Sequence, residues 1–247
     1  MSKTAIIIPA RYGSSRLEGK PLLKVAGKPV IQWVYEKAQR AKSADMIIVA
    51  TDDERIFDAV KAFGGVVEMT SVNHKCGSDR IREVADRHPE ISYIVNLQGD
   101  EPLIEPSAID TVAKNVKDDD MADISTLIRP LKTEEEINNP NLVKCVVDNN
   151  GFALYFSRSK IPYERKSAET PFYGHLGVYG YKREALIKMT TLIQTPLEKT
   201  ESLEQLRALE NGMKIKTSVV NFVPVGIDTK EDFEKFKSIV QERLTSR

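Results

Sequence analysis

Short apolar runs alternate with segments of helical spacing along the first hundred residues. Four runs have the length of buried strands and lie at residues 5–8, 46–50, 66–69 and 93–97. Between the first two, Val30, Val34 and Ala38 recur at the spacing of an amphipathic helix. Repeated strand–helix–strand units predict an α/β fold: a Rossmann-like, open and mostly parallel sheet with helices on both faces.

Helix-boundary residues flank the later periodic segments. Thr195-Pro196-Leu197-Glu198 fits a capping box with proline at the first helical position, and predicts one helix that Asn211-Gly212 ends. The segment Thr229-Lys230-Glu231-Asp232 predicts the cap of a final helix. That helix carries Phe233, Phe236 and Val240 at helical spacing.

The pattern changes near residue 140. Two apolar runs, at residues 143–147 and 152–156, are separated by Asp-Asn-Asn-Gly and predict a β-hairpin. Residues 163–173 are polar and aperiodic, as expected for a mobile loop. We therefore interpret residues 1–247 as a single domain that carries an insertion at about residues 140–212.

The amino-acid composition indicates the cell compartment to expect and the classes of binding partner that the charge does not favour. The 247 residues contain 36 Lys plus Arg and 36 Asp plus Glu, so no global charge favours nucleic acid or an anionic membrane. The only cysteines are Cys76 and Cys145, which suggests reduced thiols. No apolar segment has the length of a signal-peptide core or a membrane span. We expect a cytoplasmic protein.

The loop after the first strand carries three cations, Arg11, Arg16 and Lys20. A loop at this end of a parallel sheet suits an anion, and three fixed charges suit a nucleoside triphosphate with about four negative charges. It is not a P-loop, because Gly13 and Gly19 are one residue too far apart and Pro21 replaces the metal-binding hydroxyl. The alternative is an ordinary basic surface loop.

Carboxylates and amides follow other strands at the same edge of the predicted sheet. Asp100 is the best metal candidate, because Gly99 lets the backbone turn sharply and aims the carboxylate into the cleft. Asp228, between a strand and a helix, is a second candidate, and its alternative role is a turn or capping acid. His74 and His175 lack the spacing of zinc ligands.

Several motifs together resemble one family, the cytidylyltransferases that activate 3-deoxy-manno-octulosonate (Kdo), known as CMP-Kdo synthetases. The resemblance spans nearly the whole chain, and the motifs after residue 150 are its most specific part. The motifs are I-P-A-R-Y-G-S-S-R-L-E-G-K-P-L (8–22), A-T-D-D (50–53), H-K-C-G-S-D-R (74–80), N-L-Q-G-D-E-P (96–102), A-L-Y-F-S-R-S-K-I-P-Y (153–163), H-L-G-V-Y-G-Y (175–181), L-E-Q-L-R (203–207) and G-I-D-T-K-E-D (226–232).

The resemblance implies that the anomeric hydroxyl of the sugar acid attacks the α-phosphorus of CTP, forming CMP-Kdo and pyrophosphate for lipopolysaccharide synthesis. It implies magnesium as cofactor, held by Asp100 and Asp228, and Lys20 and Arg16 as catalytic groups. The implied CTP contacts are Pro9, Ala10, Arg11, Ser14, Lys20, Asp52, Gly77, Ser78 and Arg80. The implied sugar-acid contacts are Gln98, Arg158, Arg165, His175, Tyr179, Glu204 and Gln205.

The family also forms homodimers through the inserted region, so a homodimer is expected here. Two departures stand out: Glu18 replaces a usual proline, and Cys76 replaces a usual serine. For Glu204 and Arg207 the alternative is an intrahelical ion pair, and for Tyr179 it is a core aromatic. The alternative functions are activation of a related acid, such as 8-amino-Kdo or a sialic acid, and a non-catalytic nucleotide-binding regulator.

Overall fold

The computed structural model describes residues 2–13, 17–166, 170–223 and 225–245. The chain forms two compact units, Met1–Asp110 with Pro224–Arg247, and Thr111–Val223. The insertion predicted at residues 140–212 lies within the second unit, which extends further at both ends. Its role as a sugar-binding and dimerisation region stays a prediction.

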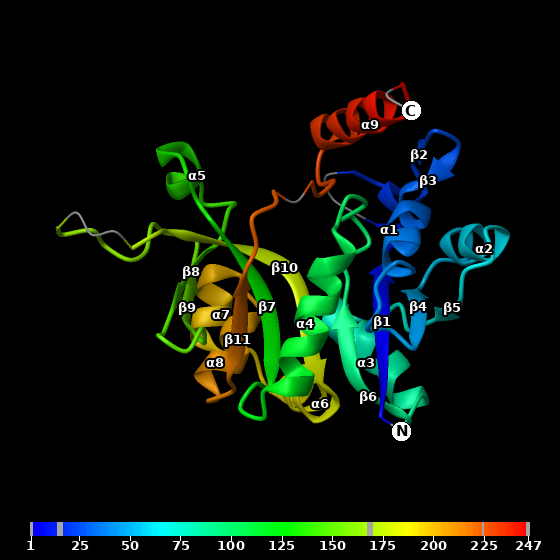
Figure 1. Ribbon diagram of the computed structural model, residues 1–247. Helices are drawn as coiled ribbons and strands as arrows, with labels where there is room; N and C mark the ends of the chain where they lie inside the picture. Colours follow the sequence, from blue (N-terminus) through cyan, green and yellow to red (C-terminus); the bar gives the residue numbers. More distant parts are fainter. Residues whose placement is uncertain (1, 14–16, 167–169, 224, 246–247) are drawn as a thin grey trace. The chain divides into compact units, whose positions relative to one another are not determined.

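The first unit contains a parallel sheet in the order β6-β1-β4-β5 (Figure 1). Its strands are β1 (Lys3–Ala10), β4 (Met46–Thr51), β5 (Val67–Met69) and β6 (Ile91–Asn96). Ile6, Ile7 and Ile8 of the central strand β1 have no solvent exposure. A strand covered on both faces reads as a continuous apolar run, which is why the sequence revealed this one.

Three helices connect these strands: α1 (Val30–Ala38), α2 (Glu54–Ala62) and α3 (Gly77–Arg87). The chain runs β1-β4-β5 in one direction and then returns to β6 on the other side of β1. Because parallel crossovers are right-handed, α1 and α2 cover one face of this sheet and α3 covers the other. The predicted α/β sheet with helices on both faces is confirmed.

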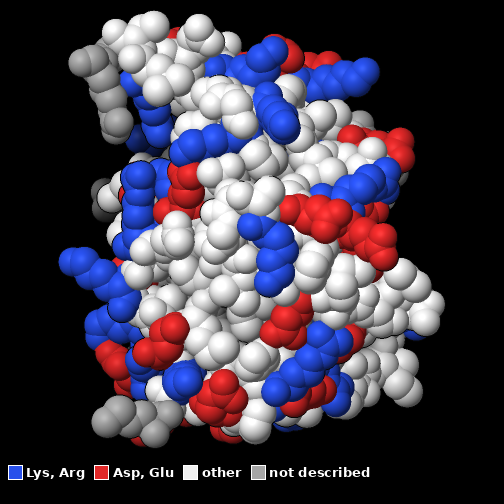
Figure 2. All heavy atoms as spheres, turned by 90° about the vertical axis from the view of Figure 1, so that its right-hand side faces the viewer, with Lys and Arg blue, Asp and Glu red and all other residues white. Residues whose placement is uncertain are grey.

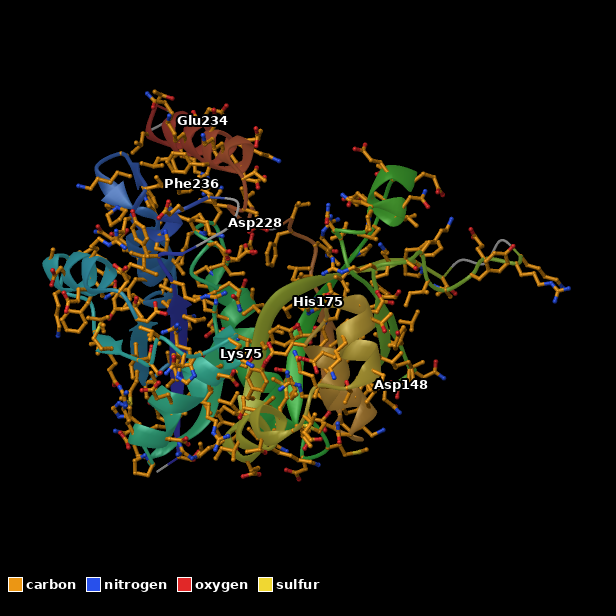
Figure 3. The ribbon with its side chains drawn as sticks, turned by 180° about the vertical axis from the view of Figure 1, so that it is seen from behind. Lys75, Asp148, His175, Asp228, Glu234 and Phe236 are labelled. Carbon is orange, nitrogen blue, oxygen red and sulfur yellow. The ribbon has the colours of Figure 1, made fainter. Side chains whose placement is uncertain are left out.

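Helix α9 (Lys230–Thr245) closes the first unit. Figure 3 labels Phe236 on this helix; it is fully buried and meets Trp33 of α1 edge to face, with ring centroids 5.9 Å apart. The remaining short elements before α1 are a 3-10 helix, η1 (Lys20–Leu22), and the hairpin β2 (Lys24–Val25) and β3 (Lys28–Pro29). Val25 of this hairpin belongs to the same apolar cluster as Phe236. The final helix thereby fixes the chain that follows the first loop.

The second unit is built on β7 (Ile124–Pro130), which pairs in parallel with β11 (Ile215–Val219) and antiparallel with β10 (Tyr173–Lys182). The start of β10 also pairs with β8 (Lys144–Val147), which forms a hairpin with β9 (Ala153–Ser157). The hairpin expected from Asp-Asn-Asn-Gly is confirmed, and Figure 3 labels Asp148 at its turn.

The remaining helices are α4, which runs from the first unit into the second, and α5 to α8. Their bounds are α4 (Pro106–Asp118), α5 (Glu134–Asn138), α6 (Arg183–Thr191), α7 (Pro196–Glu201) and α8 (Gln205–Glu210). No helix in the described ranges is long and apolar enough to cross a membrane. On the face shown in Figure 2, Lys and Arg are interspersed with Asp and Glu, in keeping with the balanced composition.

The prediction of one helix from Pro196 to Asn211 is wrong. Glu198 Oε2 accepts from the Thr195 amide at 3.2 Å, as the capping box predicts, but Ser202 adopts a left-handed conformation, with φ of 51°, and ends α7. The Leu203 amide then donates to the Glu198 carbonyl at 3.2 Å, which closes the first helix before α8 begins. A serine in this conformation carries no sequence signal comparable to a glycine.

Strand β10 is irregular between Leu176 and Tyr179, where its register with β7 shifts. Beyond the irregularity, Gly180 lies against α4. An ideal Cβ at Gly180 would stand 2.4 Å from the Val112 carbonyl oxygen and 2.5 Å from Ser125 Oγ. That hydroxyl donates to the same carbonyl at 2.6 Å, so neither atom is free to move away. Only glycine fits here.

We expect Gly180→Ala to lower the free energy of unfolding by about 3 kcal/mol, because the added methyl overpacks against backbone. Urea denaturation measures the loss. Gly177→Ala on the same strand is the matched control, since no heavy atom lies within 4 Å of its ideal Cβ. Equal midpoints for the two variants would contradict the close-packing argument.

Candidate functional site

A pocket of about 360 Å³ opens at the carboxyl ends of β1 and β6. Strand order reverses between these two strands, and ligands of open α/β sheets bind at such a switch point. Its volume falls within the usual range of small-molecule sites. The lining residues are Pro9, Ala10, Arg11, Gly13, Lys20, Pro21, Gly77, Arg80, Gln98, Gly99, Asp100 and Asp228.

The loop after β1 is held in place at Gly19, just before η1 begins. Gly19 takes a left-handed conformation with φ of 65°, and its amide donates to the Tyr12 carbonyl at 2.9 Å. An ideal Cβ there would lie 3.1 Å from the Tyr12 ring, so glycine suits both the conformation and the contact. Lys20 follows at once as the first residue of η1, and Arg11 is exposed. Ser14 and Arg16 lie outside the described residues.

Lys20 joins the two predicted metal ligands. Its Nζ lies 2.6 Å from Asp100 Oδ2 and 3.2 Å from Asp228 Oδ1. The Ile227 amide donates to the Asp100 carbonyl at 2.9 Å, which ties the two acidic loops together. Asp228, labelled in Figure 3, stands on the segment that leads into α9. Three residues distant in sequence therefore meet at one point.

Asp228, for which a turn or capping role was the alternative, directly precedes the residue that caps α9. Thr229 caps α9: its Oγ1 accepts from the Asp232 amide at 3.2 Å, and Asp232 Oδ2 accepts from the Thr229 amide at 2.9 Å. The Asp228 carboxylate itself accepts from the Lys20 ammonium at 3.2 Å.

Gly99 has a different role from the one predicted. Its φ is not in the left-handed region, so a sharp turn does not require glycine. The constraint is contact: an ideal Cβ would stand 2.9 Å from the Pro9 carbonyl oxygen. Gly99 therefore lets the loop after β6 approach the end of β1, and it is this approach that places Asp100 in the pocket.

Glu101 is a site residue that the sequence analysis missed, because nothing in the sequence shows that its side chain is buried beside the acidic pair. Its Oε2 is buried and has no hydrogen-bond partner among the residues that the structure describes. Its Oε1 would lie 3.2 Å from a Cβ at Gly226. Burial, together with the charges of Asp100 and Asp228, raises the pKa of Glu101 to about 8, against the opposing charge of Lys20. A neutral carboxyl thus lies beside the acidic pair.

The residues predicted for the cytidine side also meet in the first unit. Arg80 is fully buried; one terminal nitrogen lies 2.6 Å from Asp52 Oδ2, and the other donates to Thr70 Oγ1. Ser78 is buried in the first turn of α3. Gly77 is in ordinary contact with the Pro9 ring, at 3.5 Å from its ideal Cβ. Arg80 and Asp52 form an ion pair that fixes this wall of the pocket.

The acidic pair fits a hard divalent cation. In the described ranges, no group of three or more His, Cys, Asp or Glu side chains converges in a way that could hold a metal. Two carboxylates, those of Asp100 and Asp228, direct oxygen atoms at the Lys20 ammonium. Magnesium commonly uses one or two carboxylates and completes its shell with phosphate and water. These residues suit magnesium better than a metal that needs an all-protein cage.

Four predicted sugar-acid residues lie in the second unit around the β10 irregularity and the start of α8. In an unbroken strand His175 and Tyr179 would be about 13 Å apart. Here their ring centroids are 5.3 Å apart, and His175 also meets Phe156 at 5.1 Å. Glu204 is close enough for its charge to raise the Tyr179 pKa, after the larger effect of burial. Gln205, the next residue, is buried.

His175 is neutral near pH 7. Burial lowers its pKa to about 4. Its Nε2 lies 2.9 Å from Thr126 Oγ1, and that hydroxyl is also 3.0 Å and 2.9 Å from the carbonyls of Leu176 and Val178. If the single hydroxyl proton of Thr126 is donated to one of these carbonyls, His175 Nε2 donates to Thr126 Oγ1 and Nδ1 remains an acceptor. The ring offers hydrogen bonding without charge.

The other predicted sugar-acid residues are arranged differently. Arg158 donates to three backbone carbonyls, those of Pro140, Glu201 and Ser202. Arg165 is exposed on the segment after β9. Gln98 lines the pocket of the first unit instead, and its Nε2 donates to Asn96 Oδ1 at 3.2 Å.

Arg207, for which an ion pair with Glu204 was the alternative, forms a two-point buried pair with Glu198. The Nε–Oε2 distance is 2.8 Å and the Nη2–Oε1 distance is 2.5 Å. The pair crosses from α8 to α7 and holds the two short helices together.

Comparison with known proteins gives consistent matches. A family model described as Cytidylyltransferase matches residues 5–215. The 3-deoxy-manno-octulosonate cytidylyltransferase of Fusobacterium nucleatum is 48% identical over 236 residues, covering 96% of each chain. The protein of the same name from Thermodesulfovibrio yellowstonii is 47% identical over 244 residues, covering 94% of this chain and 95% of that one.

A solved structure agrees with the sequence matches. CMP:2-keto-3-deoxy-manno-octonic acid synthetase, complexed with CTP, superposes with a TM-score of 0.93 at 42% identity. The match covers 98% of this chain and 100% of that one. Fold and sequence comparisons therefore point to one group of proteins.

The buried Glu101 carboxyl makes stability depend on pH. Its pKa is about 8 in the folded chain and 4.5 when exposed, so between these values the folded state binds the extra proton. Unfolding free energy attributable to Glu101 then falls as pH rises, by about 1.4 kcal/mol per pH unit. We expect Glu101→Gln to gain stability relative to the wild type between pH 5 and pH 8, measured by urea denaturation in chelator.

Glu105→Gln is the matched control for this series, because Glu105 lies on the same segment with its side chain exposed. It should follow the wild-type pH dependence. A difference between Glu101→Gln and wild type that stays constant with pH would contradict the neutral carboxyl.

Proposed function

The chain belongs to the 3-deoxy-manno-octulosonate cytidylyltransferase family, and we propose that it is a magnesium-dependent enzyme that transfers CMP from CTP to Kdo. The anomeric hydroxyl of Kdo attacks the α-phosphorus, a new oxygen–phosphorus bond forms, and pyrophosphate leaves as the hydroxyl loses its proton. The product, CMP-Kdo, serves lipopolysaccharide synthesis. The choice of Kdo as the substrate rests on the names of the relatives given above. The proposed reaction rests on the residues that line the pocket of the first unit.

One observation carries the proposal: Lys20 meets Asp100 and Asp228 at the switch point of the parallel sheet. A triphosphate needs a cation of fixed position, and its metal needs hard oxygen ligands nearby. Both are present within one pocket that Arg11 also lines. A pure nucleotide-binding regulator has no need of the second acidic residue, which disfavours that alternative.

The residues of this pocket would act by position and charge. Lys20 and Arg11 would hold the triphosphate, and Lys20 would stabilise charge that develops on the reacting phosphate. Asp52 and Arg80 would face the cytidine, with the backbone of Pro9 and Ala10 reading the base. When bound to Asp100 and Asp228, magnesium would neutralise phosphate charge and lower the pKa of the attacking hydroxyl.

In the second unit, His175, Tyr179, Glu204 and Gln205 would bind the sugar acid. Burial keeps His175 neutral and raises the pKa of the Tyr179 hydroxyl, so both groups offer hydrogen bonds to sugar hydroxyls. Arg158 and Arg165 would supply positive charge to the sugar carboxylate. Activation of a related acid, such as 8-amino-Kdo or a sialic acid, is the second candidate for the same residues.

We further propose a cytoplasmic homodimer. The two cysteines are free thiols, which suits a reducing compartment. In the insertion predicted at residues 140–212, Leu154 and Ile193 are 61% and 86% exposed, and a second copy would cover such apolar side chains.

The direct test is pyrophosphate release from CTP with each sugar acid in turn, with and without magnesium. We expect release with Kdo and magnesium, much less with a sialic acid, and none in chelator. Release without a sugar acid measures CTP hydrolysis and is subtracted. Absence of turnover with every acid would refute the enzyme proposal, and full turnover in chelator would refute the metal.

Asp100→Asn tests the acidic pair. It keeps the shape of the side chain but removes the charge, so we expect kcat to fall at least 100-fold while the Kd for CTP changes less than 10-fold. Asp148→Asn, in the turn of the β8–β9 hairpin, is the matched control and should retain wild-type kcat. Near-normal kcat for Asp100→Asn at ordinary magnesium would show that Asp100 holds no metal.

A further inference from the structure

Lys144 is a fully buried lysine in β8 of the second unit. Its ammonium has three N–H groups, and each reaches a backbone carbonyl: Asn139 at 2.8 Å, Leu142 at 2.8 Å and Arg158 at 2.6 Å. No carboxylate lies within ion-pair distance in the described part of the chain, and burial lowers the Lys144 pKa. A buried charge is costly, so satisfying all three donors points to a fixed position.

The three carbonyls belong to two segments that are otherwise separate in sequence. Asn139 and Leu142 stand in the turn before β8, and Arg158 is the first residue after β9. Lys144 therefore fixes the point at which the chain leaves the hairpin. The Arg158 side chain in turn donates to the Pro140 carbonyl in the same turn, at 3.1 Å, and reaches the corner between α7 and α8.

The Arg158 side chain binds backbone carbonyls of that corner. Its Nε donates to the Glu201 carbonyl at 2.7 Å and its Nη2 to the Ser202 carbonyl at 3.4 Å. Ser202 is the left-handed residue that breaks the predicted helix, and its carbonyl accepts this bond. The hydrogen bond from the Arg158 guanidinium to Ser202 therefore stabilises the break between α7 and α8.

The Glu201 carboxylate completes the connection. Its Oε1 accepts from Ser157 Oγ at 2.6 Å, and its Oε2 accepts from the Arg158 amide at 2.9 Å. Lys144, Ser157, Arg158 and Glu201, here called the corner cluster, thus link β8, β9 and α7 through buried or half-buried bonds. Glu204 and Gln205 follow two and three residues after Ser202, at the start of α8.

We propose that Lys144 is a positioning residue for sugar-acid recognition, because it fixes Arg158 and through it the corner that presents Glu204 and Gln205. Lys144 itself touches no substrate, since its three donors are already bonded within the chain. The inference rests on the proposed function, in which Glu204 and Gln205 bind the sugar acid. According to this proposal, Lys144 contributes to the affinity for the sugar acid and does not contribute to the affinity for CTP.

The test is Lys144→Met, which keeps the length of the side chain and removes the three donors. We expect the KM for Kdo to rise at least 10-fold, while the Kd for CTP measured without sugar acid stays within twofold. Circular dichroism and a thermal melt establish that the variant is folded at the assay temperature.

Lys182→Met is the matched control. Lys182 lies in β10 of the same unit and also donates to backbone carbonyls, those of Asp119 at 3.4 Å and Asp120 at 2.8 Å. It belongs to no part of the corner cluster. We expect its KM for Kdo and its Kd for CTP to stay within twofold of wild type, whatever its melting temperature.

Glu201→Leu decides the matter if Lys144→Met does not fold. The leucine side chain has no acceptor, so the bonds from the Ser157 hydroxyl and from the Arg158 amide are both lost. A selective rise of at least threefold in the KM for Kdo supports the proposal. An unchanged KM for Kdo in the folded variants, or equal losses for Kdo and CTP, overturns it while the function stands. A wild-type chain without turnover on any sugar acid refutes the function, and this proposal with it.

Discussion

The interaction on which the site depends is the meeting of the Lys20 ammonium with Asp100 and Asp228. These residues are 80 and 208 positions apart in sequence from Lys20, and three features bring them together. Gly99 lets the loop after β6 touch the Pro9 carbonyl, the Ile227 amide binds the Asp100 carbonyl, and α9 packs on α1. Each feature fixes one of the three loops. The position of the three charged side chains therefore depends on packing throughout the first unit.

The sequence predicted the elements whose pattern is local. The strand of Ile6, Ile7 and Ile8, the hairpin around Asp148 and the cap at Thr229 all follow from apolar runs or capping residues. The break at Ser202 could not be predicted, because a left-handed serine depends on contacts such as the Arg158 bond to its carbonyl. The irregularity in β10 is similar: it depends on its pairing with β7.

The candidate site could be predicted where charged side chains lie just after the strands of the parallel sheet. Lys20, Asp100 and Asp228 were named from their charge and their place near strand ends, together with the family resemblance. The structure brings them within bonding distance. Glu101 was missed because nothing in the sequence tells an exposed turn acid from one buried beside two carboxylates. The reason for Gly99 was also missed, since close approach to Pro9 is a property of the packed sheet.

The two units use charge in opposite ways. In the first, Lys20 and the acidic pair face the pocket, where a charged triphosphate and a metal would exchange partners with them. In the second, Lys144 and Arg158 donate to backbone carbonyls, and His175 is neutral. Backbone-bound cations stabilise loop geometry, whereas neutral donors suit the many hydroxyls of a sugar. Selectivity for the sugar acid is therefore expected to depend on the position of these donors more than on net charge.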